Sequence, residues 1–477
     1  MDDVPTALWS LLGAVLIAGL AWALLVPPAE TPDEPVHVAY VQILAEAGHK
    51  ASRGPRAGHD VFSTEQKLAR RLSNYEAPIY RPSVRPEWRA SAFARWRERQ
   101  RHLPAGARRD GGATNSAGGN PPLYYAWEAL AYRITAWTGL FTRWYAMRVW
   151  SLLLLGVAVV ATWLMVGEIT GGERMAQLPA AALVGLQPGG TAISAAINPD
   201  AGMIAAWALV LWLGVRLLVR GPSVGGVLAL LAATLVALLI KATSFGLLPA
   251  VALALALSLW PVLRRGSLSV RRLAAPAALV GAAVVAVVVS GAGDRLTRAL
   301  SGGGHATPRG FLSYLWQAYL PNLPFQTPVR NLAAFWGYDV WIKSAWGNFG
   351  WAELLLPAWA YVAIAVGCAI VVVGAVLALA RRRFPVEAGV LAFLGTAAAV
   401  LVLGLHWAEY RQFLDLHLSL LQGRYLLPLL PIGGLAVAAA LANLPRPRRP
   451  LAISALLVAL FALQVFSLGI VIGRFYA

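Results

Sequence analysis

Long apolar runs alternate with short polar breaks along most of the chain, and this pattern predicts membrane-spanning helices. A helix needs about 20 apolar residues to cross the hydrocarbon core of a bilayer. Eleven runs come close to that length, at residues 7–26, 145–167, 176–197, 201–219, 224–240, 245–262, 273–292, 354–380, 386–406, 425–442 and 451–473. We therefore expect an all-α polytopic membrane protein, one transmembrane domain over 1–477, with large outer loops at 27–143 and 293–353 that carry interfacial helices.

Two segments leave alternatives open. The first apolar run follows the acidic leader Met1-Asp2-Asp3 and has no Ala-x-Ala cleavage site, so we interpret it as a retained helix rather than a secretory signal. The segment 122–140 contains Glu128, Arg133 and several aromatic residues, which favours an interfacial or re-entrant helix. If that segment spans the membrane, the orientation of everything after it is reversed.

Composition supports the membrane interpretation and removes other classes. Hydrophobic residues make up 58% of the chain and charged residues 13%, and the mean hydropathy is +0.62. Soluble globular chains are about half apolar and a quarter charged, so a soluble enzyme and a disordered chain are excluded. The net charge of +18 would suggest nucleic acid in a soluble protein. Here most basic residues lie between apolar runs, where they set topology or contact anionic lipid, so we expect no nucleic-acid partner.

The basic residues also predict the orientation. One side of the predicted membrane carries Arg174, Arg216, Arg220, Arg264, Arg265, Arg271, Arg272, Arg381, Arg382, Arg383, Arg446, Arg448 and Arg449. The short connections on the other side carry only Lys241. The positive-inside rule then places the N-terminus in the cytoplasm of a plasma (inner) membrane protein. The segments 27–143, 293–353 and 407–424 would face the outside or the periplasm.

The stretch 85–101 of the first outer loop predicts an amphipathic helix. Trp88, Ala92 and Trp96 recur at i, i+4 and i+8 among six arginines. Such a helix would lie in the membrane interface with its aromatic rings towards the lipid. It would either anchor the loop or gather a lipid that carries phosphate.

Charged side chains are missing from the middle of every predicted span. Ion-coupled transporters usually hold such groups at the bilayer midplane, so an ion-driven carrier is disfavoured. The sequence Gln187-Pro188-Gly189-Gly190 predicts an uncharged kink within the third span. The lone Cys368 lies in an apolar run, which excludes an intrachain disulfide and a cysteine metal site.

Charged groups gather instead at the outer ends of the spans. Asp33 and Glu34 stand between Pro32 and Pro35, and these prolines stiffen the backbone around the two carboxylates. His37 and Tyr40 follow on the same predicted helix. The other outer ends contribute Asp200, Lys241, His406, Arg411, Arg424 and Tyr425.

Simpler roles exist for these residues. Asp33 and Asp200 could each cap a helix, and Lys241 could extend to the headgroups. Arg424 and Tyr425 could be interfacial anchors. If the groups converge, however, they supply a carboxylate base and cations that bind phosphate, which is what glycosyl transfer from a lipid phosphate needs. A hydrolytic glycosidase would instead need two carboxylates flanking the bond. If the acceptor enters opposite the phosphate, we expect single-displacement, inverting transfer.

Four short motifs in this order resemble the GT-C superfamily of membrane glycosyltransferases, and bacterial GT-C-like membrane proteins in particular. They are Pro32-Asp33-Glu34-Pro35-x-His37, Asn120-Pro121-Pro122-Leu123-Tyr124-Tyr125, Asn198-x-Asp200 and Gly423-Arg424-Tyr425-Leu426-Leu427-Pro428. The resemblance implies a GT-C-type fold and a sugar donated by a polyprenyl-phosphate carrier. It also implies acceptor recognition by the loops 27–143 and 293–353.

The resemblance further implies roles for single residues. Asp33 would be the catalytic base, and Glu34 would orient Asp33, the acceptor or a cation. Asp200 would match the second-loop carboxylate, and Arg424 with Tyr425 would lie near the donor phosphate. Position alone, without a motif, adds Lys241 and His406 as substrate-binding candidates. His37 of the first motif, Tyr40 and Arg411 are further candidates for substrate binding.

The sequence leaves the cofactor, the acceptor and some rival functions open. We expect no obligatory cofactor, although the carboxylates are also compatible with a divalent cation. The acceptor would be a cell-envelope glycan, a lipid or a protein. The main alternative is a flippase or exporter of a lipid-linked sugar, followed by a non-catalytic scaffold and a phospholipid-headgroup transferase.

Overall fold

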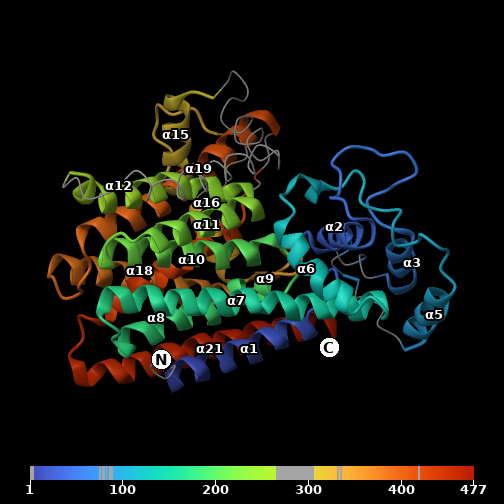
Figure 1. Ribbon diagram of the computed structural model, residues 1–477, viewed down its shortest axis with the longest axis horizontal. Helices are drawn as coiled ribbons and strands as arrows, with labels where there is room; N and C mark the ends of the chain where they lie inside the picture. Colours follow the sequence, from blue (N-terminus) through green and yellow to red (C-terminus); the bar gives the residue numbers. More distant parts are fainter. Residues whose placement is uncertain are drawn as a thin grey trace.

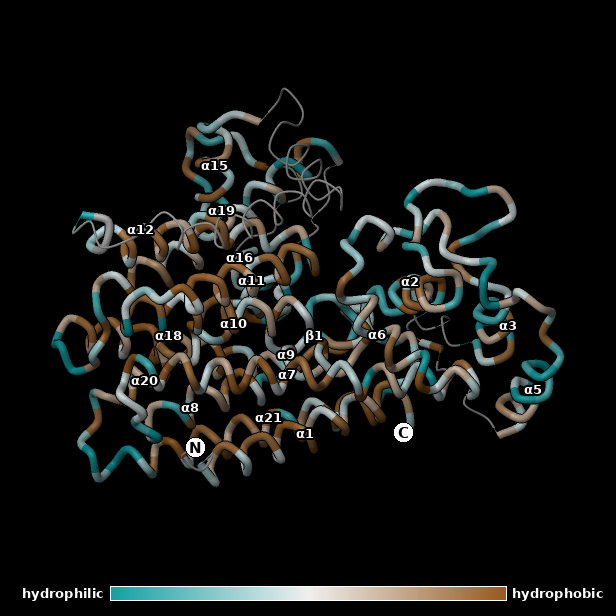
Figure 2. The backbone as a smooth tube through the Cα atoms, viewed as in Figure 1, coloured by the Kyte–Doolittle hydropathy of each residue, from teal (hydrophilic) through white to brown (hydrophobic). Residues whose placement is uncertain are grey.

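The computed structural model describes residues 5–74, 77, 81, 83–84, 90–264, 306–329, 332, 336–416, 419 and 421–477. Long helices running side by side form a bundle, and a smaller group of helices projects from one end of it (Figure 1). That group contains α2 (Glu34–Ala47), α3 (Thr64–Ser73) and α5 (Ala90–Arg101). Figure 2 shows a largely hydrophobic bundle, with many of the hydrophilic segments in the projecting group and in the loops.

The bundle consists of α1 (Thr6–Leu25), α7 (Leu140–Thr170), α8 (Arg174–Leu186), α9 (Pro188–Ser194), α10 (Pro199–Arg220), α11 (Val224–Ile240), α12 (Leu248–Arg264), α18 (Ala358–Ala380), α19 (Ala388–Leu416), α20 (Leu430–Leu441) and α21 (Arg449–Phe475). Helix α10 packs against α7 and α11, while α20 packs against α8 and α18. Large apolar side chains on the outside of the bundle are more than half exposed, among them Ile17, Val366 and Val458. Such exposure of apolar surface suits a bundle whose outer face contacts lipid.

Eight segments among the described residues are long and apolar enough to cross a membrane. They are Thr6–Leu25, Leu140–Thr170, Pro199–Arg220, Ala242–Pro261, Ala358–Ala380, Ala388–Asp415, Gly423–Leu441 and Arg446–Phe475. Each overlaps a run predicted from the sequence. The chain is therefore an all-α, multi-pass membrane protein, as predicted.

Three predicted spans need separate comment. The run 224–240 forms α11, which has 17 residues. The run 176–197 is divided at Gln187 into α8 and α9, as the Gln-Pro-Gly-Gly sequence predicted. The Gln187 amide donates to the carbonyl of Ala345 (2.7 Å) across this break. The predicted span 273–292 lies outside the described residues.

Short elements connect the long helices. They are η1 (Ser116–Gly119), α6 (Leu123–Ile134), η2 (Ala242–Leu247), α15 (Pro308–Tyr319), α16 (Trp336–Tyr338), the π-helical η3 (Asp339–Ser344), α17 (Ala345–Gly347), η4 (Gly423–Leu429) and η5 (Arg446–Arg448). Strands β1 (Asn348–Phe349) and β2 (Leu354–Leu355) pair antiparallel and are the only named strands in the described part of the chain.

Helix α6 settles whether the segment 122–140 spans the membrane. The helix has 12 residues, which correspond to a length of about 18 Å. The hydrocarbon core is about 30 Å thick, so α6 is too short to cross it. It packs against α2 and α7 instead. The orientation of the later spans is therefore not reversed by this segment.

Helix α5 differs from its predicted interfacial placement. Trp96 is only 2% exposed, and its ring packs edge-on against Phe141 of α7 with a centroid distance of 5.7 Å. Helix α5 also packs against α3. The prediction that this aromatic face lies towards the lipid is thus wrong for Trp96, because the protein itself covers the ring. Trp88, the other ring of the predicted face, lies outside the described residues.

Candidate active site

Four charged side chains from distant parts of the sequence meet at the end of the bundle from which α2 projects. Arg424 on η4 donates from Nη2 to Oδ2 of Asp33 at 2.6 Å. The Nε of Arg424 lies 3.5 Å from Oδ2 of Asp200, and Lys241 forms an ion pair with Oδ1 of Asp200. We call Asp33, Asp200, Lys241 and Arg424 the charged cluster. Its charges alternate in sign, which lets each ion lie beside a counter-ion.

The two carboxylates of the cluster differ in accessibility. The side chain of Asp200 is fully buried, whereas that of Asp33 is 46% exposed. The side chains of Arg424 and Lys241 are 12% and 16% exposed. Asp200 is therefore suited to hold the two cations in place. Asp33 is the carboxylate that a bound molecule can reach.

Neither aspartate has the helix-capping role that the sequence left open. Asp33 precedes α2 with a left-handed φ of 64°, and its side chain makes no capping hydrogen bond. At the start of α10, the side chain of Asn198 accepts from the backbone N–H of Asp200 (3.0 Å). The amide of Asn198 also donates to the carbonyl of Pro32 (3.3 Å). Asn198 thereby joins the loop of Asp200 to the loop of Asp33 and leaves both carboxylates to the cluster.

The pKa of Asp33 is set by two opposing effects. Burial alone would raise it, but the positive charge and the hydrogen bond of Arg424 outweigh burial and hold the pKa below its ordinary value. Asp33 is therefore ionised at neutral pH, which is the state a general base requires.

Glu34, the neighbour of Asp33, is turned into the protein. It is fully buried and receives two hydrogen bonds from Arg148 of α7, of 2.7 and 2.6 Å. The backbone N–H groups of Ala29 and Ile197 donate to the same carboxylate, at 3.1 and 3.2 Å. Its oxygens are thus occupied by the fold. This arrangement suits orientation of Asp33, one of the roles expected for Glu34, rather than contact with a substrate.

The predicted tyrosine and histidine candidates differ in how close they lie to the charged cluster. Tyr425 lies beside the cluster, with Lys241 Nζ 4.8 Å from its ring centroid. His37 lies one turn after Asp33 on α2 and is 5% exposed. Tyr40 is fully buried and stacks on Tyr125 of α6 at 3.7 Å between centroids. Tyr40 therefore supports the wall behind the site.

His406 and Arg411 lie on α19, apart from the contacts that hold the charged cluster. Both ring nitrogens of His406 are engaged: Nδ1 by the hydroxyl of Tyr314 at 3.2 Å and Nε2 by that of Tyr319 at 2.6 Å. His406 is 1% exposed, so it belongs to a buried group of aromatic side chains and is not accessible to a substrate. Arg411 is half-buried near the end of the same helix.

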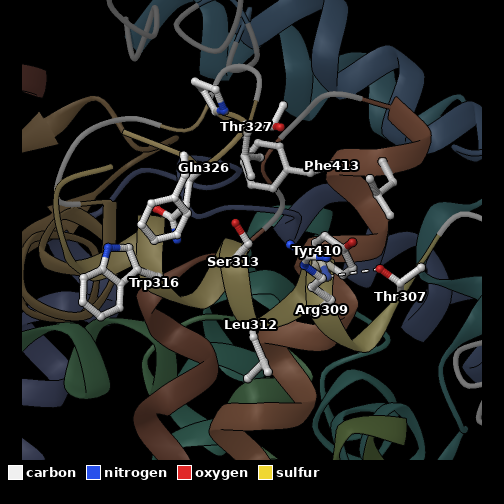
Figure 3. Close-up of a pocket in the computed structure, with 14 residues that line it drawn as sticks. Thr307, Arg309, Leu312, Ser313, Trp316, Gln326, Thr327, Tyr410 and Phe413 are labelled. Carbon is white, nitrogen blue, oxygen red and sulfur yellow. Dashed lines mark hydrogen bonds between the residues drawn. The ribbon is translucent and has the colours of Figure 1, made fainter. Parts of the chain in front are cut away.

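A cavity of about 770 Å³ adjoins that aromatic core. It is bounded by α15, by the segment 325–329 and by the end of α19, with Trp316, Ser313 and Tyr410 on its wall (Figure 3). No residue of the charged cluster is among its lining residues. The cavity is thus separate from Asp33.

Sequence reasoning assigned no role to several residues that shape the site. Arg148 is fully buried, and its pairing with Glu34 joins α7 to the start of α2. An arginine near the end of an otherwise apolar run was the available signal. Asn120, Tyr125 and Asn198 belong to the quoted motifs, but their contacts could not be inferred from the sequence.

Among the described residues, no group of three or more His, Cys, Asp or Glu side chains is arranged to hold a metal ion. Asp33 faces a guanidinium, and Asp200 faces both a guanidinium and an ammonium. Each of these carboxylates thus already has a cationic partner, and a divalent ion would have to displace it.

The family described as "Predicted membrane protein (DUF2142)" matches residues 16–433. No curated protein matches the chain. The chain is similar to the crystal structure of ArnT from Cupriavidus metallidurans bound to undecaprenyl phosphate, with 14% identity and a TM-score of 0.47 over 96% of this chain and 64% of that one. It is similar to the apo form of the same protein, with 15% identity and a TM-score of 0.46 over 94% and 62% of the two chains.

A third similar structure is the apo form of the Archaeoglobus fulgidus oligosaccharyltransferase, with 13% identity and a TM-score of 0.44 over 98% of this chain and 55% of that one. The chain spans less than two thirds of the length of each of these proteins.

Proposed function

The chain belongs to the DUF2142 family of membrane proteins, and we propose that this member is an inverting glycosyltransferase. It moves a sugar from a polyprenyl-phosphate donor to a glycan, lipid or protein acceptor of the cell envelope. The observation that carries the proposal is the contact of an accessible carboxylate, Asp33, with Arg424 at one end of a membrane bundle. Lys241 and Tyr425 adjoin that contact.

Asp33 acts as the general base in this reaction. It accepts the proton of an acceptor hydroxyl while the hydroxyl oxygen forms a bond to the anomeric carbon of the donor sugar. The bond between that carbon and the phosphate oxygen breaks, and polyprenyl phosphate leaves with the electron pair. Attack opposite the departing phosphate inverts the anomeric configuration. The phosphate is a good leaving group, so it needs charge stabilisation rather than a general acid.

Arg424 and Lys241 supply that stabilisation. A guanidinium binds phosphate oxygens through two N–H groups, and Tyr425 lies beside both cations. The buried Nε of Arg424 makes no hydrogen bond with any described residue and has only the longer ion pair with Oδ2 of Asp200, at 3.5 Å, so its N–H group can still donate to a ligand. A donor phosphate would compete with Asp33 for Arg424. Donor binding would thereby loosen the contact that depresses the basicity of Asp33.

No obligatory metal takes part in the proposed reaction. Asp33 and Asp200 each already pair with a cation of the cluster. Arg424 and Lys241 stabilise the negative charge of the phosphate, which is the role a divalent ion would otherwise have. Turnover that persists in EDTA supports this assignment, and turnover that EDTA abolishes and Mg²⁺ or Mn²⁺ restores contradicts it.

The site faces the outside or the periplasm in this proposal. Asp33 follows the C-terminal end of α1, the end remote from residue 5, and in chain order the basic connections predicted to be cytoplasmic join the opposite ends of the spans. A cysteine-directed, membrane-impermeant label at Ser116→Cys, an exposed position of the first outer loop, should react in intact cells. Protection in intact cells but not in lysed cells would reverse the orientation.

The experiment that tests the proposed reaction is a transfer assay in nanodiscs with a panel of synthetic polyprenyl-phosphate sugars. Release of polyprenyl phosphate by the wild type, and its loss in Asp33→Asn, is the expected result. Asp339→Asn is the matched control, because Asp339 is 44% exposed and also pairs with a cation, Lys343 at 2.6 Å. Equal rates in wild type and Asp33→Asn would remove Asp33 as the base.

A further inference from the structure

The motif Asn120–Tyr125 forms the wall behind His37. The hydroxyl of Tyr125 lies 2.9 Å from Nδ1 of His37, and the Asn120 amide nitrogen donates to the same hydroxyl at 2.9 Å. Tyr40 stacks on the Tyr125 ring with an interplanar angle of 8°, and its hydroxyl donates to the carbonyl of Asn120 at 3.2 Å. The fully buried Tyr125 is therefore held on its face and at its oxygen.

These contacts favour one set of proton positions. An amide NH₂ group can only donate, so the oxygen of Tyr125 accepts from Asn120. With that acceptor role filled, Tyr125 can direct its single hydroxyl proton to Nδ1 of His37, which is then the unprotonated nitrogen. Burial lowers the pKa of His37 to about 4 and raises that of Tyr125 well above its ordinary value. Both groups are thus neutral at physiological pH, and the ring proton of His37 resides on Nε2.

His37 lies next to the charged cluster. His37 follows Asp33 by one helical turn, and its backbone N–H donates to the carbonyl of Asp33 at 3.2 Å. The charged groups that act on the imidazole are Asp33, Arg424, Asp200 and Lys241. Nδ1 is occupied by Tyr125, whereas Nε2 has no hydrogen-bond partner among the described residues.

We propose that Asn120 and Tyr125 are positioning residues that hold His37 as a neutral Nε2–H donor to an oxygen of the substrate. That oxygen belongs to the phosphoryl group of the lipid carrier or to a sugar hydroxyl. A neutral imidazole can donate a hydrogen bond to such an oxygen. A charged imidazolium would in addition be an acid next to the base Asp33. The opposite tautomer would present a lone pair, which repels a phosphoryl oxygen and can only accept a hydrogen bond from a hydroxyl. This inference rests on the proposed function for the identity of the ligand, whereas its proton assignment is independent of the reaction.

Nitrogen NMR of histidine-labelled protein in nanodiscs tests the proton assignment. His37→Gln identifies the signal of His37. We expect the neutral tautomer with the proton on Nε2 in the wild type, and a change towards mixed tautomers in Tyr125→Phe. Tyr124→Phe is the matched control, since Tyr124 is also fully buried and adjacent but contacts Ser151 at 3.3 Å. A proton on Nδ1 in the wild type, or equal spectra of wild type and Tyr125→Phe, overturns the positioning role of Asn120 and Tyr125.

The ligand is tested with two probes added separately to the same samples. A shift of the Nε2 signal with a short-chain polyprenyl phosphate assigns the phosphoryl oxygen, and a shift with a methyl glycoside assigns a hydroxyl. No shift with either probe overturns the donor role. In a transfer assay, Tyr125→Phe should raise the KM for the ligand so assigned about tenfold with a smaller change in kcat, which equals about one hydrogen bond.

The NMR arms separate this inference from the proposed reaction. If the wild type transfers no sugar but shows the Nε2–H tautomer and a ligand shift, the reaction is wrong and the role of His37 stands. If the wild type transfers sugar but carries the proton on Nδ1, the inference fails and the reaction stands.

Discussion

Arg148 and Glu34 form a bidentate ion pair inside the protein, with Nε–Oε1 and Nη2–Oε2 distances of 2.7 and 2.6 Å. The guanidinium also donates to carbonyls at the end of α1, those of Ala23, Val26 and Pro27. One side chain thus binds one of the free carbonyls of the last turn of α1 and two carbonyls just after it, and it fixes the first residue of α2. Asp33 stands in the turn between these helices, so its position depends on this pair.

Removing one partner of this pair should be costly. Arg148→Ala leaves a buried carboxylate without its counter-ion, and such losses destabilise proteins by about 3–5 kcal/mol. Thermal unfolding in detergent should show a large drop in Tm. Arg101→Ala is the control, because Arg101 and Glu98 form an exposed pair at 3.2 Å, and such pairs contribute about 0–1 kcal/mol. Equal Tm values for wild type and Arg148→Ala would contradict the structural role of the pair.

The buried carboxyl group of Glu30 should make the stability of the protein depend on pH. It is fully buried, and both its oxygens lack a hydrogen-bond partner among the described residues. Burial, with Glu353 nearby, raises the pKa of Glu30 from 4.5 to about 9. The folded protein therefore holds a proton that the unfolded chain releases. Between pH 4.5 and about 9 the free energy of unfolding should fall with rising pH, by about 1.4 kcal/mol per pH unit from this group.

Glu30→Gln keeps the shape and removes that titration. Its stability should exceed that of the wild type increasingly as pH rises through this window, measured as unfolding at pH 5, 7 and 9. The exposed Glu98→Gln should follow the wild-type profile. A profile of Glu30→Gln parallel to that of the wild type would show that Glu30 is ionised in the folded protein.

Arg424 predicts the acid limit of activity. Burial raises the pKa of Asp33, and the charge and hydrogen bond of Arg424 make the largest contributions that lower it, ahead of those of His37 and Lys241. Without Arg424 the largest lowering contributions are lost, so the pKa of Asp33 rises and the carboxylate is protonated at a higher pH. In Arg424→Gln the acid limb of the kcat profile should therefore move to higher pH. Donor binding should also weaken.

The pH profile of Arg101→Gln should coincide with that of the wild type, since Arg101 is exposed on α5. An unmoved acid limb in Arg424→Gln would mean that Asp33 is not the titrating base. Unchanged kcat and donor KM in the same variant would reduce Arg424 to an anchor.

The spans could be predicted from the sequence because bilayer thickness sets one simple requirement, an apolar run of sufficient length. The break at Gln187 was equally readable, since proline and glycine interrupt helices by local stereochemistry. Successive spans cross the membrane in opposite directions. From this the sequence predicted that the charged groups gather at one end of the spans. Trp96 shows the limit: periodicity identified its face of the helix, but not whether lipid or Phe141 covers that face.

The pairing of individual side chains could not be predicted in the same way. Asp33 and Glu34 are adjacent and equally acidic in sequence, and their different environments arise from partners far along the chain. Arg424 holds Asp33, whereas Arg148 holds Glu34. Likewise, their positions in the sequence made both His406 and His37 candidates for substrate binding. The hydrogen bonds of His406 with Tyr314 and Tyr319, which exclude it from the open site, could not be predicted from the sequence.

The measurement that tests the central claim most directly is mass spectrometry of the lipids that copurify with the wild type and with Asp33→Asn. The proposed reaction predicts a polyprenyl-phosphate sugar enriched in the variant, which binds the donor but cannot turn it over, and spent polyprenyl phosphate in the wild type. The mass difference would also give the class of sugar. Intact carrier in both proteins would contradict catalysis by Asp33, and bulk phospholipid alone in both would contradict the polyprenyl-phosphate donor.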